Sequence, residues 1–254
     1  MNTTMSALIA DHMRAAASRR PGDRIGPFTV GIDSHSDDPM RNFAVPDSGA
    51  CPAAAEVDAL IAFFRESRRI PRLEYVEDSA PDVERVLLAA GFTVERRTPV
   101  MISTPDSRLT PREPAGITVR EAVSDADFAA AAVVQHHAYG VPVPPGLEDI
   151  ARLARVAERG GVVGVAVDDA SGDVVGTGLV DVTGPEDPVG ELAAVGVRTE
   201  FRRRGIASAL SAHLARTAHA RGIGLVFLEA ESDEESIYRR TGFTDVSTKI
   251  WIRG

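Results

Sequence analysis

The chain has 254 residues, of which 44% are hydrophobic and 26% charged, a composition typical of a globular protein with one or two domains. Its formal net charge of −9 argues against a general nucleic-acid-binding surface, because phosphate binding needs a basic face. A single cysteine, Cys51, excludes an intramolecular disulfide and a multi-cysteine metal site, and we expect no metal. With no apolar run near the roughly 18 residues of a membrane span, we expect a cytoplasmic monomer or homodimer that does not bind membranes.

The first half of the chain shows two helical patterns and a short strand. Met5, Leu8, Ile9 and Met13 fall at helical spacing near the N-terminus, as do Val57, Leu60, Ile61 and Phe64 further on. A short strand is expected over Leu73–Val76. Three prolines and alternating charges then predict a linker over 104–115, which separates a domain at 1–103 from a domain at 116–254.

The second half begins with a strand, two helices and three strands. Ile117–Val123 is typical of a strand, and Ser124 with Asp127 forms a capping box that opens a helix through about Ala138. A second helix is expected from about Leu147 to Ala157. Hairpin-length turns connect the next three strands and make them antiparallel neighbours, at residues 161–168, 174–182 and 191–197.

The remaining pattern alternates helix and strand. A helix is expected from about Gly205 to Arg221, then a strand over 225–230. Ser232 and Glu235 form another capping box, whose helix ends at Gly242, and a final strand runs over 243–252. The order βααβββαβαβ predicts an α/β (α+β) three-layer domain, with a mixed, mostly antiparallel sheet flanked by helices.

A basic turn at the start of the long helix predicts an anion site. Arg202, Arg203 and Arg204 lie between a strand and a helix, and Gly205 follows them. The first turn of a helix leaves backbone N–H groups without partners and carries partial positive charge. Since glycine lets a ligand approach the backbone closely, a pyrophosphate suits this place.

Two motifs resemble those of the GNAT (Gcn5-related) N-acetyltransferases. Arg202-x-x-Gly205-x-Ala207 is similar to the (Gln/Arg)-x-x-Gly-x-(Gly/Ala) loop of that family, and it likewise lies between a strand and a helix. Tyr238-x-x-x-Gly242-Phe243 is similar to the Tyr-x-x-x-Gly-Phe segment near the family's C-terminus. The resemblance covers about Ile117 to Gly254 and implies the GNAT fold.

The resemblance also implies acetyl-CoA as the acyl donor. In the family, the strand before the loop contacts the acetyl and pantetheine groups through its backbone, and the loop amides hold the pyrophosphate. Carried onto this chain, the residues implied are Val195, Val197, Arg202, Arg203, Arg204, Gly205, Ile206, Ala207 and Ser208.

Two residues are candidates for acid–base catalysis. The resemblance suggests Glu191 as a base that acts on the acceptor ammonium, often through water; a solvent-edge carboxylate is the alternative, and Glu229 and Glu231 are weaker candidates. Tyr238 is a candidate proton donor to the leaving thiolate, with simple packing as the alternative. One departure concerns Glu231, which stands where family members often have an asparagine that contacts the cofactor.

The expected activity is transfer of an acetyl group to a primary amine of a small molecule or protein. Glu231 at the asparagine position keeps a second hypothesis open, a non-catalytic acyl-CoA-binding sensor or interaction module.

An internal repeat links the two halves. The segment from Glu84 to Thr93 matches the segment from Glu235 to Thr244 in its acidic start and its Gly-Phe-Thr end. Each follows a short strand, so the first half resembles a smaller, degenerate GNAT-like domain. Leu87 stands where Tyr238 stands, and no arginine cluster precedes the first half's helix; a chance match at a common glycine stop is the alternative.

Overall fold

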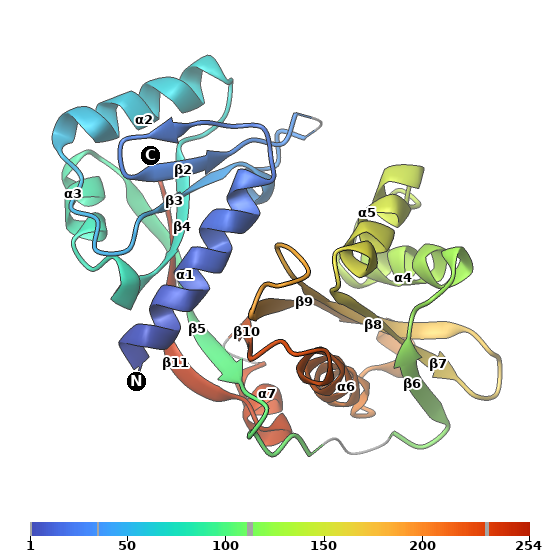
Figure 1. Ribbon diagram of the computed structural model, residues 1–254. Coiled ribbons are helices and arrows are strands. Elements are labelled where there is room, and N and C mark those ends of the chain that lie inside the picture. The colour runs from blue at the N-terminus through green and yellow to red at the C-terminus, as the bar shows by residue number, and fades with distance from the viewer. Residues whose placement is uncertain (1, 35, 111–113, 232–233) are drawn as a thin grey trace. The chain divides into compact units, whose positions relative to one another are not determined.

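The computed structural model describes residues 2–34, 36–110, 114–231 and 234–254 (Figure 1). The chain divides into two compact units, one formed by Met1–Val100 with Asp245–Gly254 and the other by Met101–Thr244. The predicted second domain, 116–254, includes residues 245–254, whereas in the structure these residues group with the first unit. The reason is strand pairing, because the last strand is hydrogen-bonded to a strand of the first unit from Lys249↔Val76 to Arg253↔Arg72.

The first unit contains a sheet and three helices. The strand order in this sheet is β1 (Arg24–Ile25), β2 (Phe28–Gly31), β3 (Phe43–Pro46), β4 (Arg72–Val76), β11 (Thr244–Arg253) and β5 (Thr93–Ser103), whose last three residues belong to the second unit. The helices are α1 (Asn2–Ser18), α2 (Ala54–Glu66) and α3 (Val83–Ala89). The two expected helices and the expected strand are therefore confirmed, while the short strands β1 to β3 were not predicted.

The two faces of this sheet are covered by different helices. Leu73 and Tyr75 of β4 pack with Leu60 and Phe64 of α2 and with Leu87 of α3 in one buried cluster. Successive side chains of a strand point to opposite faces. The alternate residues of β4 therefore face the other side, where α1 packs against β2, β3 and β4.

Buried ion pairs join β11 to β4 in this unit. Lys249, the only lysine of the chain, places its Nζ 2.8 Å from Oε2 of Glu74. Glu74 also pairs with Arg72, whose Nε lies 2.7 Å from Glu95, and the guanidinium carbon of Arg72 lies 4.3 Å from the ring centre of Trp251. Buried charges are tolerated only when paired, so Lys249 is matched to the first unit rather than to the domain that precedes it in sequence.

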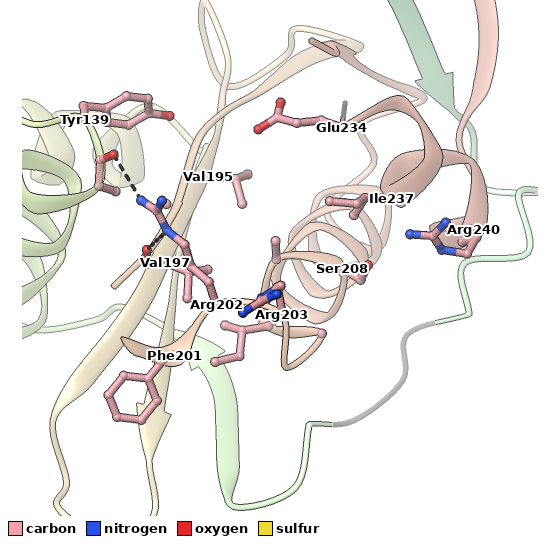
Figure 2. A pocket seen from close by; sticks show the side chains of 15 residues that line it. Tyr139, Val195, Val197, Phe201, Arg202, Arg203, Ser208, Glu234, Ile237 and Arg240 are labelled. Atoms are coloured by element: carbon pink, nitrogen blue, oxygen red, sulfur yellow. Dashed lines mark hydrogen bonds between the residues drawn. The ribbon is translucent and has the colours of Figure 1, made fainter. Parts of the chain in front are cut away.

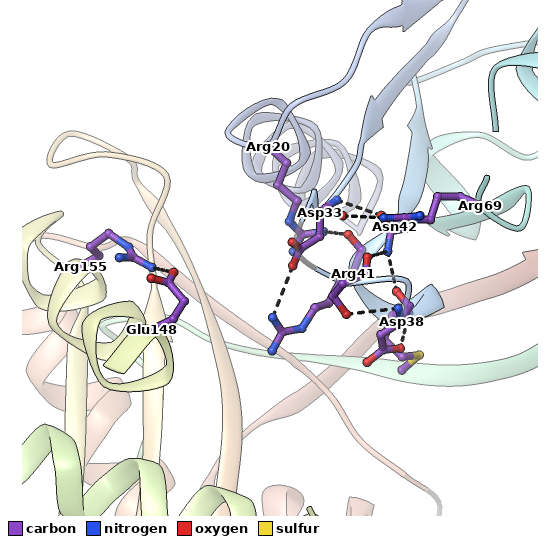
Figure 3. A network of polar contacts seen from close by, with 10 residues as sticks. Arg20, Asp33, Asp38, Arg41, Asn42, Arg69, Glu148 and Arg155 are labelled. Carbon is purple, nitrogen blue, oxygen red and sulfur yellow. Dashed lines mark hydrogen bonds and ion pairs between the residues drawn. The ribbon is translucent and has the colours of Figure 1, made fainter. Parts of the chain in front are cut away.

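The connection between β2 and β3 is organised by one buried asparagine (Figure 3). The side-chain Nδ2 of Asn42 donates to the carbonyl oxygens of Ser36 at 3.0 Å and Asp38 at 2.7 Å. Its Oδ1 accepts from the backbone N–H of Asp33 at 2.8 Å and from Nε of Arg69 at 3.2 Å. Because an amide side chain offers two donors and one acceptor oxygen, Asn42 satisfies its bonding capacity here and holds the loop.

The second unit has the strand order β10 (Leu225–Glu229), β9 (Val189–Val197), β8 (Val174–Asp181), β7 (Val162–Asp168) and β6 (Ile117–Glu121). Its helices are α4 (Asp125–Ala138), α5 (Leu147–Glu158), α6 (Ile206–Ala220) and α7 (Glu235–Thr241). β10 is parallel to β9, and the pairs β9–β8, β8–β7 and β7–β6 are antiparallel, so the expected mixed sheet is confirmed. Among the described residues, no helix is both long and apolar enough to cross a membrane.

This unit has three layers. Val162 and Val180 pack with Leu214 of α6, whereas their strand neighbours Val163 and Leu179 pack with α4 and α5. Helix α6 comes close to the sheet because glycines lie beneath it: a Cβ added at Gly178 would come within 3.0 Å of Leu214. Figure 1 shows α4 and α5 on one side of strands β6 to β9 and α6 on the other.

The internal repeat has matching local structure in the two units. Helix α3 ends with a bond from the Phe92 N–H to the Leu87 carbonyl at 3.0 Å, and α7 ends with the same bond from Phe243 to Tyr238 at 3.0 Å. The intervening glycine is left-handed in both cases, with φ of 89° at Gly91 and 113° at Gly242. The two segments thus share the same helix end as well as the same sequence pattern. The cap predicted at Ser232 lies outside the described residues.

The predicted capping box at the start of α4 is present, and it includes an ion pair. Ser124 Oγ accepts from the Asp127 N–H at 3.2 Å, and Asp127 accepts from the Ser124 N–H at 3.3 Å. Arg120 donates to both carboxylate oxygens of Asp127, at 2.6 and 3.0 Å. The Arg120 hydrogen bond is the main reason that the pKa of Asp127 lies well below its usual value, with backbone and Ser124 bonds adding to it.

We expect Asp127→Asn to lower the free energy of unfolding by about 1–2 kcal/mol at pH 7, the scale of a cap plus a charge-assisted bond. Because the pKa of Asp127 is lower in the folded state than in the unfolded state, its ionised carboxylate stabilises the fold at pH values above the unfolded-state pKa near 3.9. This stabilisation is lost as the pH falls through the folded-state pKa. The difference between variant and wild type, measured by urea unfolding, therefore shrinks below about pH 4. Asp125→Asn, exposed in the same first turn, is the control; equal effects of the two variants would contradict the assignment.

Candidate active site

A cavity of about 710 Å³ lies in the second unit, at the end of β9. It is lined by residues from four places: the end of α4, the last residues of β9, the turn and first turn of α6, and one side of α7. Figure 2 shows Arg202 and Arg203 toward one end and Tyr139 and Glu234 toward the other, with Val195 between them. The cavity therefore has a cationic end and an end that carries a carboxylate.

A bulge in β9 positions the middle of the cavity. Thr177 pairs with Gly196 and Leu179 with Ala193, so one residue of β8 faces two residues of β9, Ala194 and Val195. Ala194 has φ of 54°, which is uncommon for a residue with a side chain and costs on the order of 1 kcal/mol or more. β9 pairs with β10 from Val189 to Glu191, and beyond the bulge Val195, Gly196 and Val197 line the cavity.

The start of α6 supplies backbone donors. Gly205 is the N-cap residue, left-handed at φ 86°, and no side chain caps the helix there. The first turn contains no acidic residue, and Ile206, Ala207 and Ser208 line the cavity. A Cβ added at Gly205 would meet no atom within 4 Å, so this backbone is open to a ligand. Uncapped N–H groups and the helix dipole make this a site for an anion.

The three arginines of the predicted turn have different surroundings. Arg202 donates to the carbonyl oxygens of Val197 at 3.1 Å and Ala138 at 3.5 Å, and so ties β9 to the end of α4 (Figure 2). Arg204 donates to the Ala115 carbonyl at 3.1 Å and is not among the lining residues. Arg203 lines the cavity from a left-handed backbone position with φ of 61°. Arg203 is therefore the arginine of this turn best placed to add charge inside the cavity.

Tyr238 lies on α7 next to the lining residue Ile237, but it is buried in the core cluster with Leu214 and is not among the residues that line the cavity. Its ring makes an edge-on contact with Phe243 at 6.0 Å between centroids. Burial raises the pKa of Tyr238 above its usual value near 10, and the nearby Glu234 and Tyr139 raise it further. The phenol therefore keeps its proton throughout the physiological pH range.

Glu191 lies where β9 is still paired on both sides, opposite Asp181 of β8 and Phe227 of β10. It is half-buried, and it is not among the residues that line the cavity. Ala193, two residues on, packs in the cluster under α4 and α5. Strand alternation places Glu191 on that same face of the sheet.

Several lining residues were missed by sequence reasoning, among them Tyr139, Glu234 and Arg240. Arg240 is part of the Tyr238–Phe243 segment, whose helical spacing puts residues 237 and 240 on one side of α7. Tyr139 follows the expected helix end directly. Glu234 had no local signal, because only folding brings the start of α7 to the end of β9.

Comparisons with known proteins show which family and which fold this chain is similar to. Residues 129–243 match the family model described as Acetyltransferase (GNAT) family. A structure described as a GCN5-related N-acetyltransferase from Kribbella flavida is 25% identical, with 98% of this chain and 95% of that chain covered and a TM-score of 0.79. One from Sphaerobacter thermophilus, of the same description, is 26% identical over 79% of this chain and 66% of that chain, with a TM-score of 0.64.

A structure described as a tandem GNAT protein from the clavulanic acid biosynthesis pathway shares the fold at 15% identity, with 99% of this chain and 95% of that chain covered and a TM-score of 0.62. No curated protein sequence matches the chain. The family model spans every residue that lines the cavity. Residues 129–243 therefore form an acetyltransferase domain of the GNAT family, and this match together with the similar structures supports an acyltransferase.

Proposed function

We propose that the protein transfers an acetyl group from acetyl-CoA to a primary amine of a small molecule or protein, and that it does so in the cytoplasm. The observation that carries this proposal is the open start of α6 at one end of the cavity, next to the end of the bulged strand β9. The backbone N–H groups of the first turn and the side chain of Arg203 suit the pyrophosphate of the donor.

The donor brings a thioester-activated acetyl group, and this chain's residues would orient it and handle the protons. Backbone N–H groups at Val195 or Val197 would donate to the carbonyl oxygen as negative charge develops on it. Glu191 would take up the proton of the acceptor ammonium through water, since it does not line the cavity itself. Tyr238, whose raised pKa keeps the phenol protonated, would give its proton to the departing sulfur.

Gly205→Asp should abolish the site for the donor, because it places a negative side chain where the pyrophosphate would lie. Wild type should bind one acetyl-CoA per chain by calorimetry, and the variant's affinity should fall by about 100-fold or more, the scale of a lost hydrogen bond to a charged group. Gly222→Asp is the matched control: Gly222 follows α6, is left-handed at φ 92° and also faces open space. A stoichiometry of two, or equal affinities for the two variants, would contradict this site.

Tyr238→Phe should lower turnover by roughly 100-fold while acetyl-CoA affinity stays at the wild-type value, because the ring remains and only the proton donor is lost. The readout is steady-state CoA release with a panel of primary amines. Tyr75→Phe, at a buried tyrosine of the first unit, is the control for removing a buried hydroxyl. If Tyr238→Phe turned over near the wild-type rate, Tyr238 would not be the proton donor and its role would be packing alone.

Glu191→Gln should remove the limb of the pH–rate profile on which turnover rises with pH, since that limb reports ionisation of the base. The profile is measured as kcat/KM against pH. Glu229→Gln and Glu231→Gln test the weaker candidates in the same assay. A Glu191→Gln profile identical to wild type would exclude Glu191 as the base.

A further inference from the structure

The cavity's charges are separated along its length. Arg202, Arg203 and the start of α6 supply positive charge at one end (Figure 2), and Arg240 adds charge from α7, whereas Glu234 is the one carboxylate among the described residues that line the cavity. An anionic donor is attracted to the first group and repelled by the second. A cation is the group that suits the place beside Glu234.

Tyr139 faces Glu234 across this end of the cavity. Figure 2 shows the phenol of Tyr139 and the carboxylate of Glu234 turned toward each other, above Val195. Both also act on the pKa of Tyr238, which places all three side chains in one neighbourhood. Tyrosine and glutamate together offer a ring face and oxygens, which are the groups that bind an ammonium ion.

The segment that continues from Tyr139 is unusually apolar for an exposed loop. Tyr139 is 60% exposed and Leu147 87%, and Val141 and Val143 between them are also exposed. An exposed apolar patch of this kind marks a binding surface. Of these four residues Tyr139 lines the cavity, and the other three continue from it beyond the lining residues.

Hydrogen bonds hold this segment in place. Nδ1 of His136 lies 2.8 Å from the Val143 carbonyl oxygen, and the Val141 N–H donates to the His136 carbonyl at 2.8 Å. Nε2 of His136 lies 3.5 Å from the carboxylate of Asp149 on α5. The apolar side chains are therefore displayed on a fixed loop rather than left on a loose one.

We propose that Glu234 and Tyr139 form the acceptor site, and that the acceptor is a primary amine on an apolar body without a carboxylate near the amine. This inference rests on the proposed acetyl transfer. Glu234 binds the ammonium, and Tyr139 with the following apolar segment contacts the body. Glu234 is in this role a substrate-binding residue, separate from the proposed base Glu191.

The test uses the full-length protein, acetyl-CoA and three amines, with CoA release as the readout. Phenethylamine has the proposed chemistry, phenylalanine adds a carboxylate beside the same amine, and ethanolamine lacks the apolar body. Wild type should prefer phenethylamine to both. Glu234→Gln should raise the KM for phenethylamine by about 10- to 100-fold, the scale of a charge-assisted hydrogen bond, with kcat changed less than about threefold. Glu234→Gln should also lower the ratio of kcat/KM for phenethylamine to kcat/KM for phenylalanine, because the variant no longer repels the carboxylate of phenylalanine.

Tyr139→Ala should lower kcat/KM for phenethylamine and leave that for ethanolamine nearly unchanged. Glu235→Gln is the control for charge, since Glu235 pairs with Arg239 at 2.9 Å on α7 and does not line the cavity. Val123→Ala, at an exposed apolar residue outside the segment, is the control for lost apolar surface.

Three results would overturn the inference: an unchanged KM in Glu234→Gln, a fall in kcat alone, which would make Glu234 a proton acceptor, or a wild-type preference for phenylalanine. Calorimetry separates this failure from failure of the proposed function. If wild type binds acetyl-CoA and acetylates amines of another class, only the acceptor site is wrong. If it does not bind acetyl-CoA, the proposed function fails with it.

Discussion

The candidate active site depends on one break in regular β-structure. β9 and β10 are parallel neighbours, and a continuous ladder between them would leave no space for a ligand. The extra residue in β9, with Ala194 in a left-handed conformation, redirects the strand beyond its paired segment, so that Val195 to Val197 line the cavity. A strained backbone at a non-glycine residue persists only where the surroundings hold it. Here Ala193 and Ala194 are packed into the cluster under α4 and α5.

A second constraint acts through the last strand. β11 follows α7, a helix of the second unit that lines the cavity, yet its backbone pairs with β4 of the first unit. Lys249 and Trp251 enter a buried group of charges there, in which Glu74 lies between two cations. Truncating the chain before β11 would leave Glu74 and Arg72 without these partners. The C-terminal residues thus contribute to the stability of the first unit although they follow the acetyltransferase domain in sequence.

The two halves show how one local pattern serves two purposes. Both contain a short helix, a left-handed glycine and a strand, with the same capping bond to the residue four before the glycine. In the second half that residue is Tyr238, a buried phenol on a helix that lines the cavity, whereas in the first it is Leu87, an apolar residue of the core. Before α2, Asp47 pairs with Arg24, and Pro52 lacks an N–H. The shared pattern therefore preserves a fold, and the chemistry resides in the side chains placed on it.

Much of the second half followed from the sequence alone, because its signals are local. Helical spacing, the Ser124–Asp127 cap, the turns between strands and the glycine before α6 are each encoded within a few residues, and the structure has the elements they predict. The strands β1 to β3 escaped notice because two to four residues are too few to show a period. Tertiary structure decided three other features. It determined that β11 pairs with β4, that Tyr139 and Glu234 face the same end of the cavity, and that Glu191 does not line the cavity. Each of these features depends on which segments, distant in sequence, pack together. Buried charge pairs, strand pairing and the β9 bulge determine this packing, and they exist only in the folded chain.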